Sequence, residues 1–194
     1  IIMKKKIFII YCWDGYPEYC WYPWLKAELE ARGHEAIVSE MPQSHEPRIN
    51  KWVPELIKQV GKVDCDTYFV GHSMGNQAIA RFLEQLSEDQ VAGGAVFVAG
   101  FFDRLTGLED DPVVRSVVQE WLETDIDFSK TKNHLGKNVA IFSDNDPYVP
   151  LDNADTFEKE FGSEIMILKN RGHFSGTDYK ELLEVLKKLE SIGV

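Results

Sequence analysis

The strongest candidate for chemistry is a serine in the segment Gly71-His72-Ser73-Met74-Gly75, which has the pattern G-x-S-x-G. The segment follows a short apolar run directly and precedes a helical pattern. A strand, a sharp turn and a helix in this order expose the serine hydroxyl at the carboxyl end of a sheet. Both glycines are needed because side chains there would strike the adjoining strand or helix. We therefore predict that Ser73 is a nucleophile, and that the helix N-terminus beyond it favours developing negative charge.

A serine hydroxyl is a weak nucleophile at neutral pH and needs a base, together with a carboxylate that orients the base. After a nucleophile of this kind, the partners follow in the order Asp or Glu, then His. His173 comes directly after a glycine and shortly after the last strand-like run, 164–168, where the base is expected. The four other histidines precede the serine, lie inside the turn or lie away from a strand end: His34, His45, His72 and His134.

Two carboxylates compete for the role of the orienting acid, because Asp144 and Asp146 lie in one turn-rich loop after the run 138–143. Pro147 restricts Asp146 to an extended backbone, which suits a rigidly aimed carboxylate. We therefore favour Asp146. The alternative is that both aspartates only shape the turn.

Acyl transfer also places negative charge on a substrate oxygen, which two backbone N–H groups can stabilise. One donor is expected from the residue after the nucleophile and the other from the loop after the first strand. These positions point to Met74 and to Trp13. Chemistry of this kind needs no metal and no cofactor, and the ligand that fits it is a small acyl ester.

Apolar runs rich in β-branched and aromatic residues alternate with helical patterns along the chain, which is typical of a parallel α/β sheet. Several runs are continuously apolar, as expected for strands that are covered on both faces. We predict an α/β fold with three layers, in which helices flank a mostly parallel six-stranded sheet. The predicted strands are 6–12, 35–39, 67–71, 94–99, 138–143 and 164–168.

The predicted helices include one over 49–60 that contains Pro54, so we expect this helix to be kinked or to start late. The longest interval without a strand, 101–135, begins a short helix at Asp111-Pro112. We interpret this interval as part of a pocket wall, so that 1–194 is a single domain. Candidates for an apolar acyl pocket are Trp13, Trp21, Trp24, Phe101, Phe102 and Trp121. The alternative is that most of them are buried in the core, and for Trp24 we favour the core.

With these residues placed, the chain resembles the small serine-hydrolase family of the α/β-hydrolase fold that includes bacterial YdeN-like proteins and retinoblastoma-binding protein nine. The resemblance covers nearly the whole chain. It implies a minimal hydrolase without a full cap domain, with Ser73, Asp146 and His173 as the catalytic triad. The segments that carry it are Trp21-Tyr22-Pro23-Trp24-Leu25, Met41-Pro42, Pro47-Arg48, Trp52, the turn at Ser73, Asp146-Pro147-Tyr148-Val149-Pro150 and Gly172-His173-Phe174.

The leading hypothesis is a serine hydrolase that cleaves a small carboxylic ester or thioester through an acyl-enzyme on Ser73. A second hypothesis is a binding or regulatory module with vestigial esterase activity. It is supported by a difference from the family pattern, because family members usually carry His-Gly where this chain has Tyr11-Cys12. An acyltransferase would use the same residues, and a peptidase is disfavoured because this short chain leaves little material for a peptide cleft.

Composition excludes several classes of partner. The net charge of −11 over 194 residues argues against nucleic acid, which needs a clustered basic face, and disfavours anionic substrates at long range. The three cysteines lack the spacing of metal ligands, and no apolar run could span a membrane.

The N-terminal lysines and apolar run imitate a signal peptide, but Asp14 ends the run at its minimum length. We interpret the run as a strand, expect a cytoplasmic protein, and find no sign of a protein partner.

Overall fold

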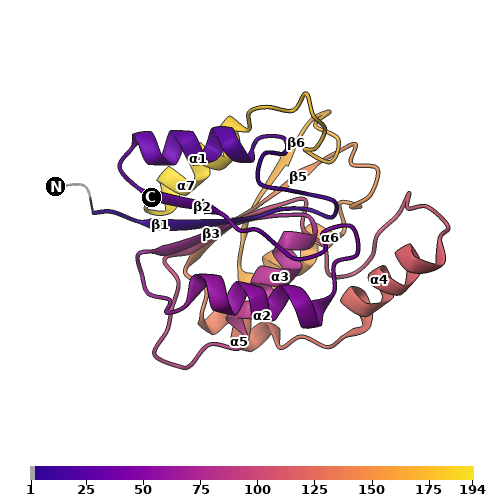
Figure 1. Cartoon of the computed structure of the whole chain (residues 1–194), viewed down its shortest axis with the longest axis horizontal. Coiled ribbons are helices and arrows are strands. Elements are labelled where there is room, and N and C mark those ends of the chain that lie inside the picture. The colour runs from indigo at the N-terminus through magenta and orange to yellow at the C-terminus, as the bar shows by residue number, and fades with distance from the viewer. Residues whose placement is uncertain (1–2) are drawn as a thin grey trace.

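The computed structural model describes residues 3–194, which contain a six-stranded sheet in the order β2-β1-β3-β4-β5-β6 (Figure 1). All neighbouring strands in the described chain are parallel, so the sheet is more uniform than the mostly parallel one predicted. Each predicted strand is present. The strands are β1 (Lys6–Ile10), β2 (Glu35–Val38), β3 (Thr67–His72), β4 (Gly94–Val98), β5 (Lys137–Ser143) and β6 (Glu164–Leu168).

Helices cover both faces of the sheet and give the fold its three layers (Figure 1). On one face lie α1 (Tyr22–Ala31) and α7 (Leu183–Ile192). On the other face lie α2 (Ile49–Val60), α3 (Met74–Leu83) and α5 (Phe128–Asn133). This arrangement confirms the predicted three-layer α/β fold.

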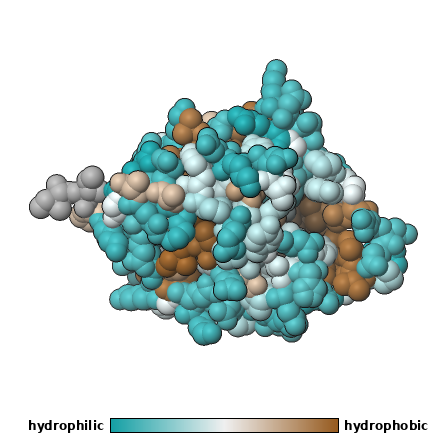
Figure 2. Space-filling view, turned by 45° about the horizontal axis from the view of Figure 1, so that its top comes forward, coloured by the Kyte–Doolittle hydropathy of each residue, from teal (hydrophilic) through white to brown (hydrophobic). Residues whose placement is uncertain are grey.

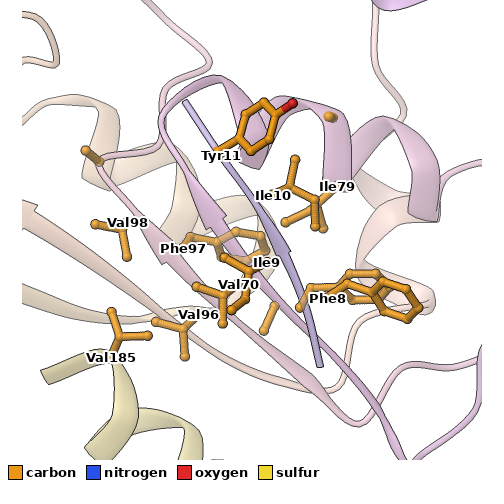
Figure 3. Close-up of a cluster of buried hydrophobic side chains, with 14 of the residues drawn as sticks. Phe8, Ile9, Ile10, Tyr11, Val70, Ile79, Val96, Phe97, Val98 and Val185 are labelled. Carbon is orange, nitrogen blue, oxygen red and sulfur yellow. The ribbon is translucent and has the colours of Figure 1, made fainter. Parts of the chain in front are cut away.

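The core fills the space on both sides of the central strands β1, β3 and β4 (Figure 3). Ile79 of α3 and Val185 of α7 are fully buried, as are Val70, Val96 and Phe97 of the strands between them. Burying a side chain of this size stabilises a fold by about 1.5–3 kcal/mol. The continuously apolar runs therefore lie in the middle of the sheet, where both faces are covered.

Helix α2 corrects one expectation from the sequence. It begins at Ile49, so Pro54 lies inside it and the expected late start is wrong. The proline removes one backbone hydrogen bond. The buried side chains of Trp52 and Leu56 on the same helix keep it on the sheet in spite of that loss.

The interval 101–135 contains α4 (Pro112–Glu123) and α5, and α4 projects from the layers at the right of Figure 1. As predicted, Asp111 caps α4, and its carboxylate accepts hydrogen bonds from two N–H groups of the first turn. Only Val117 and Trp121 of α4 are buried. The buried guanidinium of Arg81 donates to three backbone carbonyls at the C-terminal end of α4. The C-terminal end of α4 is thus anchored to the core, whereas its first turn packs no buried side chain against it.

The remaining helical segment is a short α6 (Asn153–Thr156), which continues into the π-helix η1 (Phe157–Phe161). The cysteines carry free thiols, and burial raises the pKa of Cys12 to about 11 and of Cys20 to about 12, so both are protonated and unreactive. A membrane-crossing helix would need more length and more apolar character than any helix within residues 3–194 has.

Candidate active site

Four loops that carry the predicted site residues meet at one edge of the sheet. They follow β1, β3, β5 and β6, and parallel strands place all of their carboxyl ends at the same edge. Ligands of open α/β sheets bind in crevices at this edge. Trp13, Ser73, Asp146 and His173, which are far apart in the sequence, are therefore brought to one place.

The turn between β3 and α3 holds Ser73 in a strained backbone conformation, with φ of 52° and ψ of −115°. A Cβ atom at Gly71 would overlap the side chain of Asn76, and one at Gly75 would overlap the carbonyl oxygen of Ile10. Both glycines are therefore required by close approach, as expected. Asn76 Nδ2 also donates to the Ser73 carbonyl (3.1 Å) and to a carbonyl of β4 (2.8 Å), which stabilises the turn.

His173 and Asp146 form a buried pair. The Nδ1 of His173 lies 2.8 Å from Oδ2 of Asp146, and their side chains are only 11% and 2% exposed. The other carboxylate oxygen accepts hydrogen bonds from the N–H groups of Tyr148 and Val149. A carboxylate accepts, so Nδ1 carries the proton, and Nε2 keeps the lone pair that a general base needs.

The loop after β5 is fastened to the loop after β6 by four consecutive side chains. Asp144 is one of them and contacts backbone, whereas Asp146 contacts the imidazole of His173. Sequence reasoning did not find the roles of Ser143 and Asn145. The four acceptors and donors are Ser143 Oγ with Arg171 N (3.0 Å), Asp144 Oδ1 with Asn170 N (2.8 Å), Asn145 Oδ1 with Gly172 N (2.8 Å), and Asp146 Oδ2 with His173 Nδ1 (2.8 Å).

Ser73 and His173 line the same cavity, which has a volume of about 570 Å³. No hydrogen bond joins the Ser73 hydroxyl to His173 Nε2 among residues 3–194. In enzymes without substrate such bonds are often long and tighten only in the reacting complex. The arrangement places a hydroxyl, an imidazole and its carboxylate around one open space.

The two predicted oxyanion donors also border this cavity. Neither the Met74 N–H nor the Trp13 N–H has an acceptor in the described part of the chain. The neighbouring Cys12 N–H is occupied, because it donates to the hydroxyl of Tyr22. The indole of Trp13 donates to the carbonyl of His45, which ties the loop after β1 to the loop after β2. Free N–H groups beside the serine are what a developing oxyanion requires.

The wall of the cavity beside α4 is largely aliphatic. Leu105, Leu108, Val113 and Val114 line it, and Figure 2 shows hydrophobic residues gathered in a hollow at the right of the molecule, where Figure 1 places α4. The charged side chains among the lining residues are all carboxylates: Asp14, Glu109 and Asp111. The cavity is therefore suited to an apolar group that carries no negative charge.

Most of the aromatic residues proposed for an acyl pocket lie elsewhere. Trp13 and Phe101 line the cavity, but Trp21 and Trp121 are fully buried in the core and donate their indole N–H groups to backbone carbonyls. Phe102 packs in an aromatic cluster on α5 and η1. The pocket prediction is corrected accordingly: aliphatic side chains of the loop 101–111 and of α4 replace most of the aromatic ones.

His72 directly precedes Ser73 in the chain and is fully buried. Its Nδ1 lies 2.6 Å from the hydroxyl of Tyr22, and its Nε2 lies 2.8 Å from the backbone carbonyl of His173. Burial, together with the nearby imidazole of His173, lowers the pKa of His72 to about 3. This ring is neutral at the pH of ordinary assays.

The lowered pKa of His72 predicts an acid-sensitive fold. The unfolded chain gains a proton at His72 near pH 6.5 and the folded chain only near pH 3, so the free energy of unfolding falls as the pH drops through this interval. The loss approaches about 1.4 kcal/mol for each pH unit. Urea unfolding near pH 7 and pH 5 measures it, and His72→Gln, which has no group to titrate, should lose less stability than wild type. Equal losses in the two proteins would contradict the prediction.

A parallel sheet with helices on both faces, and a serine held in a strained turn beside an imidazole–carboxylate pair, define a serine hydrolase of the α/β-hydrolase fold. The sequence model of the serine hydrolase family matches residues 7–190. The chain belongs to this family and is an enzyme.

Individual relatives agree with this assignment. The hydrolase YdeN of Bacillus subtilis is 29% identical over 172 residues, which cover 89% of this chain and 87% of that protein. The rat serine hydrolase RBBP9 is 24% identical over 172 residues, which cover 87% and 86%. The crystal structure of the B. subtilis ydeN gene product superposes with a TM-score of 0.88 at 27% identity and covers 97% of this chain and 98% of that one.

A more distant structure shares the fold alone. Est1E from Butyrivibrio proteoclasticus, solved with ferulic acid bound, matches with a TM-score of 0.71 at 14% identity, covering 97% of this chain and 89% of that one.

Proposed function

We propose that this enzyme cleaves a small carboxylic ester or thioester that has an uncharged, apolar acyl group. The observation that carries the proposal is the 2.8 Å contact between His173 and Asp146, beside the cavity that Ser73 also lines. The aliphatic wall and the absence of Lys and Arg from the lining residues support the apolar, uncharged acyl group.

In the proposed reaction the Ser73 oxygen attacks the acyl carbon while His173 Nε2 takes the hydroxyl proton. His173 then gives this proton to the leaving alcohol or thiol, and an acyl-enzyme remains. In the second step water attacks the acyl carbon and gives a proton to His173. The bond between the acyl carbon and the Ser73 oxygen then breaks, His173 returns the proton to that oxygen, and the acid is released. Asp146 holds the Nδ1–H tautomer throughout, and the N–H groups of Met74 and Trp13 stabilise the oxyanion.

Fluorophosphonate labelling followed by peptide mapping tests the nucleophile, and a panel of p-nitrophenyl esters from acetate to octanoate tests the substrate class. We expect one phosphonylated residue, Ser73, and hydrolysis of the neutral esters. Labelling at another serine would contradict the assignment of Ser73. A folded protein that neither reacts with the probe nor hydrolyses any ester would contradict the proposed function.

The cavity wall predicts a chain-length effect for Val114, which borders both the active-site cavity and an adjoining groove along α4. Val114→Trp adds a large side chain at this shared wall. We expect kcat/KM for octanoate to fall by about 10- to 100-fold, whereas acetate is little affected, because discrimination in an apolar pocket is of this size. Val91→Trp, at an exposed valine that does not line either space, is the control. Equal losses for acetate and octanoate would contradict an acyl site on this wall.

A further inference from the structure

A chain of buried hydrogen bonds runs behind the site, from the loop after β1 to the loop after β6. Tyr22 and His72 form its middle and are both 0% exposed. The links are Cys12 N to Tyr22 Oη at 3.2 Å, Tyr22 Oη to His72 Nδ1 at 2.6 Å, and His72 Nε2 to the carbonyl oxygen of His173 at 2.8 Å. None of these links joins two strands of the sheet.

The direction of each hydrogen bond follows from the chemistry of its ends. A backbone carbonyl only accepts, so His72 Nε2 must carry the proton and donate it to His173 O. Nδ1 is then unprotonated and accepts from the Tyr22 hydroxyl. The Tyr22 oxygen in turn accepts from the Cys12 N–H. Cys12 Sγ lies 3.4 Å from the same hydroxyl, but the 2.6 Å contact to His72 takes the proton.

The segment that supplies Tyr22 holds the histidine loop at further points. Trp21 Nε1 donates to the Phe174 carbonyl (2.9 Å), and the Tyr19 hydroxyl accepts from the Gly176 N–H (2.9 Å). Phe174 has a positive φ of 54°, a strained conformation that persists only where surrounding contacts determine it. The backbone from His173 to Gly176 is therefore held by Trp21, Tyr19 and His72.

We propose that His72 and Tyr22 are positioning residues, which fix the backbone of His173 relative to Ser73 and hold, through the Cys12 N–H, the loop that carries Trp13. This inference rests on the proposed function. His72 adjoins Ser73 in the chain, so the bond to the His173 carbonyl links the base to the turn that holds the nucleophile. A displacement of about 1 Å in such a pair can cost about 100-fold in rate.

Two amide substitutions of His72 distinguish its bond to the His173 carbonyl from its bond to the Tyr22 hydroxyl. Glutamine places its amide near the position of Nε2 and can still donate to His173 O, whereas the shorter asparagine reaches only as far as Nδ1. We expect His72→Asn to lower kcat and the rate constant of fluorophosphonate labelling by about 10- to 100-fold, with KM little changed. His72→Gln should recover most of both rates. The downfield proton resonance of His173 Nδ1–H should shift or broaden in His72→Asn and be retained in His72→Gln.

His134 provides a matched control, because it is also buried and also has a ring nitrogen on a backbone carbonyl. Its Nδ1 lies 2.7 Å from the carbonyl oxygen of Gln90. His134→Gln removes that bond and should lower stability without changing kcat. The proposal is wrong if His72→Asn is folded and retains the wild-type labelling rate. It is also wrong if His72→Asn and His72→Gln each lower kcat only as far as their loss in free energy of unfolding accounts for.

Tyr22→Phe keeps the test decisive if His72→Asn does not fold. It removes the hydroxyl between Cys12 and His72 and should lower kcat with KM unchanged. A folded Tyr22→Phe protein with wild-type kcat would overturn the proposal. Failure of the proposed function gives a different result, since the wild-type protein itself would then show neither labelling nor ester hydrolysis.

Discussion

Replacing Ser73 with alanine is expected to lower kcat for p-nitrophenyl ester hydrolysis by about 10⁵-fold or more, because no other group in the proposed reaction can form the acyl-enzyme. This loss corresponds to about 7 kcal/mol of transition-state stabilisation. The fold should persist, since the hydroxyl makes no hydrogen bond that the turn needs and Asn76 holds the turn through backbone carbonyls. Steady-state kinetics and circular dichroism on the same preparation measure both effects.

Ser39→Ala is the matched control for that experiment. Ser39 is fully buried at the end of β2, and its hydroxyl has no hydrogen-bond partner among residues 3–194. It should keep wild-type turnover and fluorophosphonate labelling, whereas Ser73→Ala loses both. Turnover of a Ser73→Ala protein at the wild-type rate would show that the nucleophile is another group.

Asp146→Asn should lower kcat by about 10⁴-fold while the protein remains folded. The asparagine oxygen can still accept from the Tyr148 and Val149 N–H groups, so the loop is retained. Its NH₂ group then faces His173 Nδ1 and favours the tautomer that is protonated on Nε2, which cannot accept the serine proton. A kcat measurement across the pH range, with thermal unfolding as a check on the fold, gives the effect.

Asp144→Asn offers a close comparison, because Asp144 lies in the same loop and its Oδ1 accepts from the Asn170 N–H. An asparagine there retains an accepting oxygen, so we expect kcat close to wild type. If the two substitutions had equal effects, Asp146 would be a residue that shapes the loop rather than the partner of the base.

The parts of this fold that the sequence predicts are those governed by local patterns. Apolar runs that alternate with helical patterns identify all six strands, and the glycines at 71 and 75 predict a turn whose tightness the structure confirms. The position of His173 follows from the order of strands and loops alone. These features depend on a few adjacent residues, so they can be predicted without knowledge of tertiary contacts.

The hydrogen bonds that hold the site depend on contacts between distant segments, and the sequence does not reveal them. Tyr22 and His72 are separated by 50 residues, and Ser143 and Arg171 by 28. Nothing in the local pattern marks either pair. The aromatic residues show a different error, because several of those predicted to line the pocket lie in the core. A tryptophan in the core and one in a pocket are preceded and followed by similar residues, so the local sequence does not distinguish them. Trp121 lies in the core although its neighbour Leu122 borders the groove along α4.

The site combines a turn after the central strand β3 with loops after β5 and β6, and this division has a consequence for biosynthesis. The turn around Ser73 is complete once β3 and β4 are paired, because the Ser73 N–H donates to the carbonyl of Val98. The base and its carboxylate belong to the loops after β5 and β6, which come later in the chain than β4 and are joined to each other by hydrogen bonds. A nascent chain that has folded through β4 therefore holds a strained but unactivated serine. The proposed ester hydrolysis requires that the edge strand β6 has joined the sheet, so its onset during translation would report the last step in assembling the sheet.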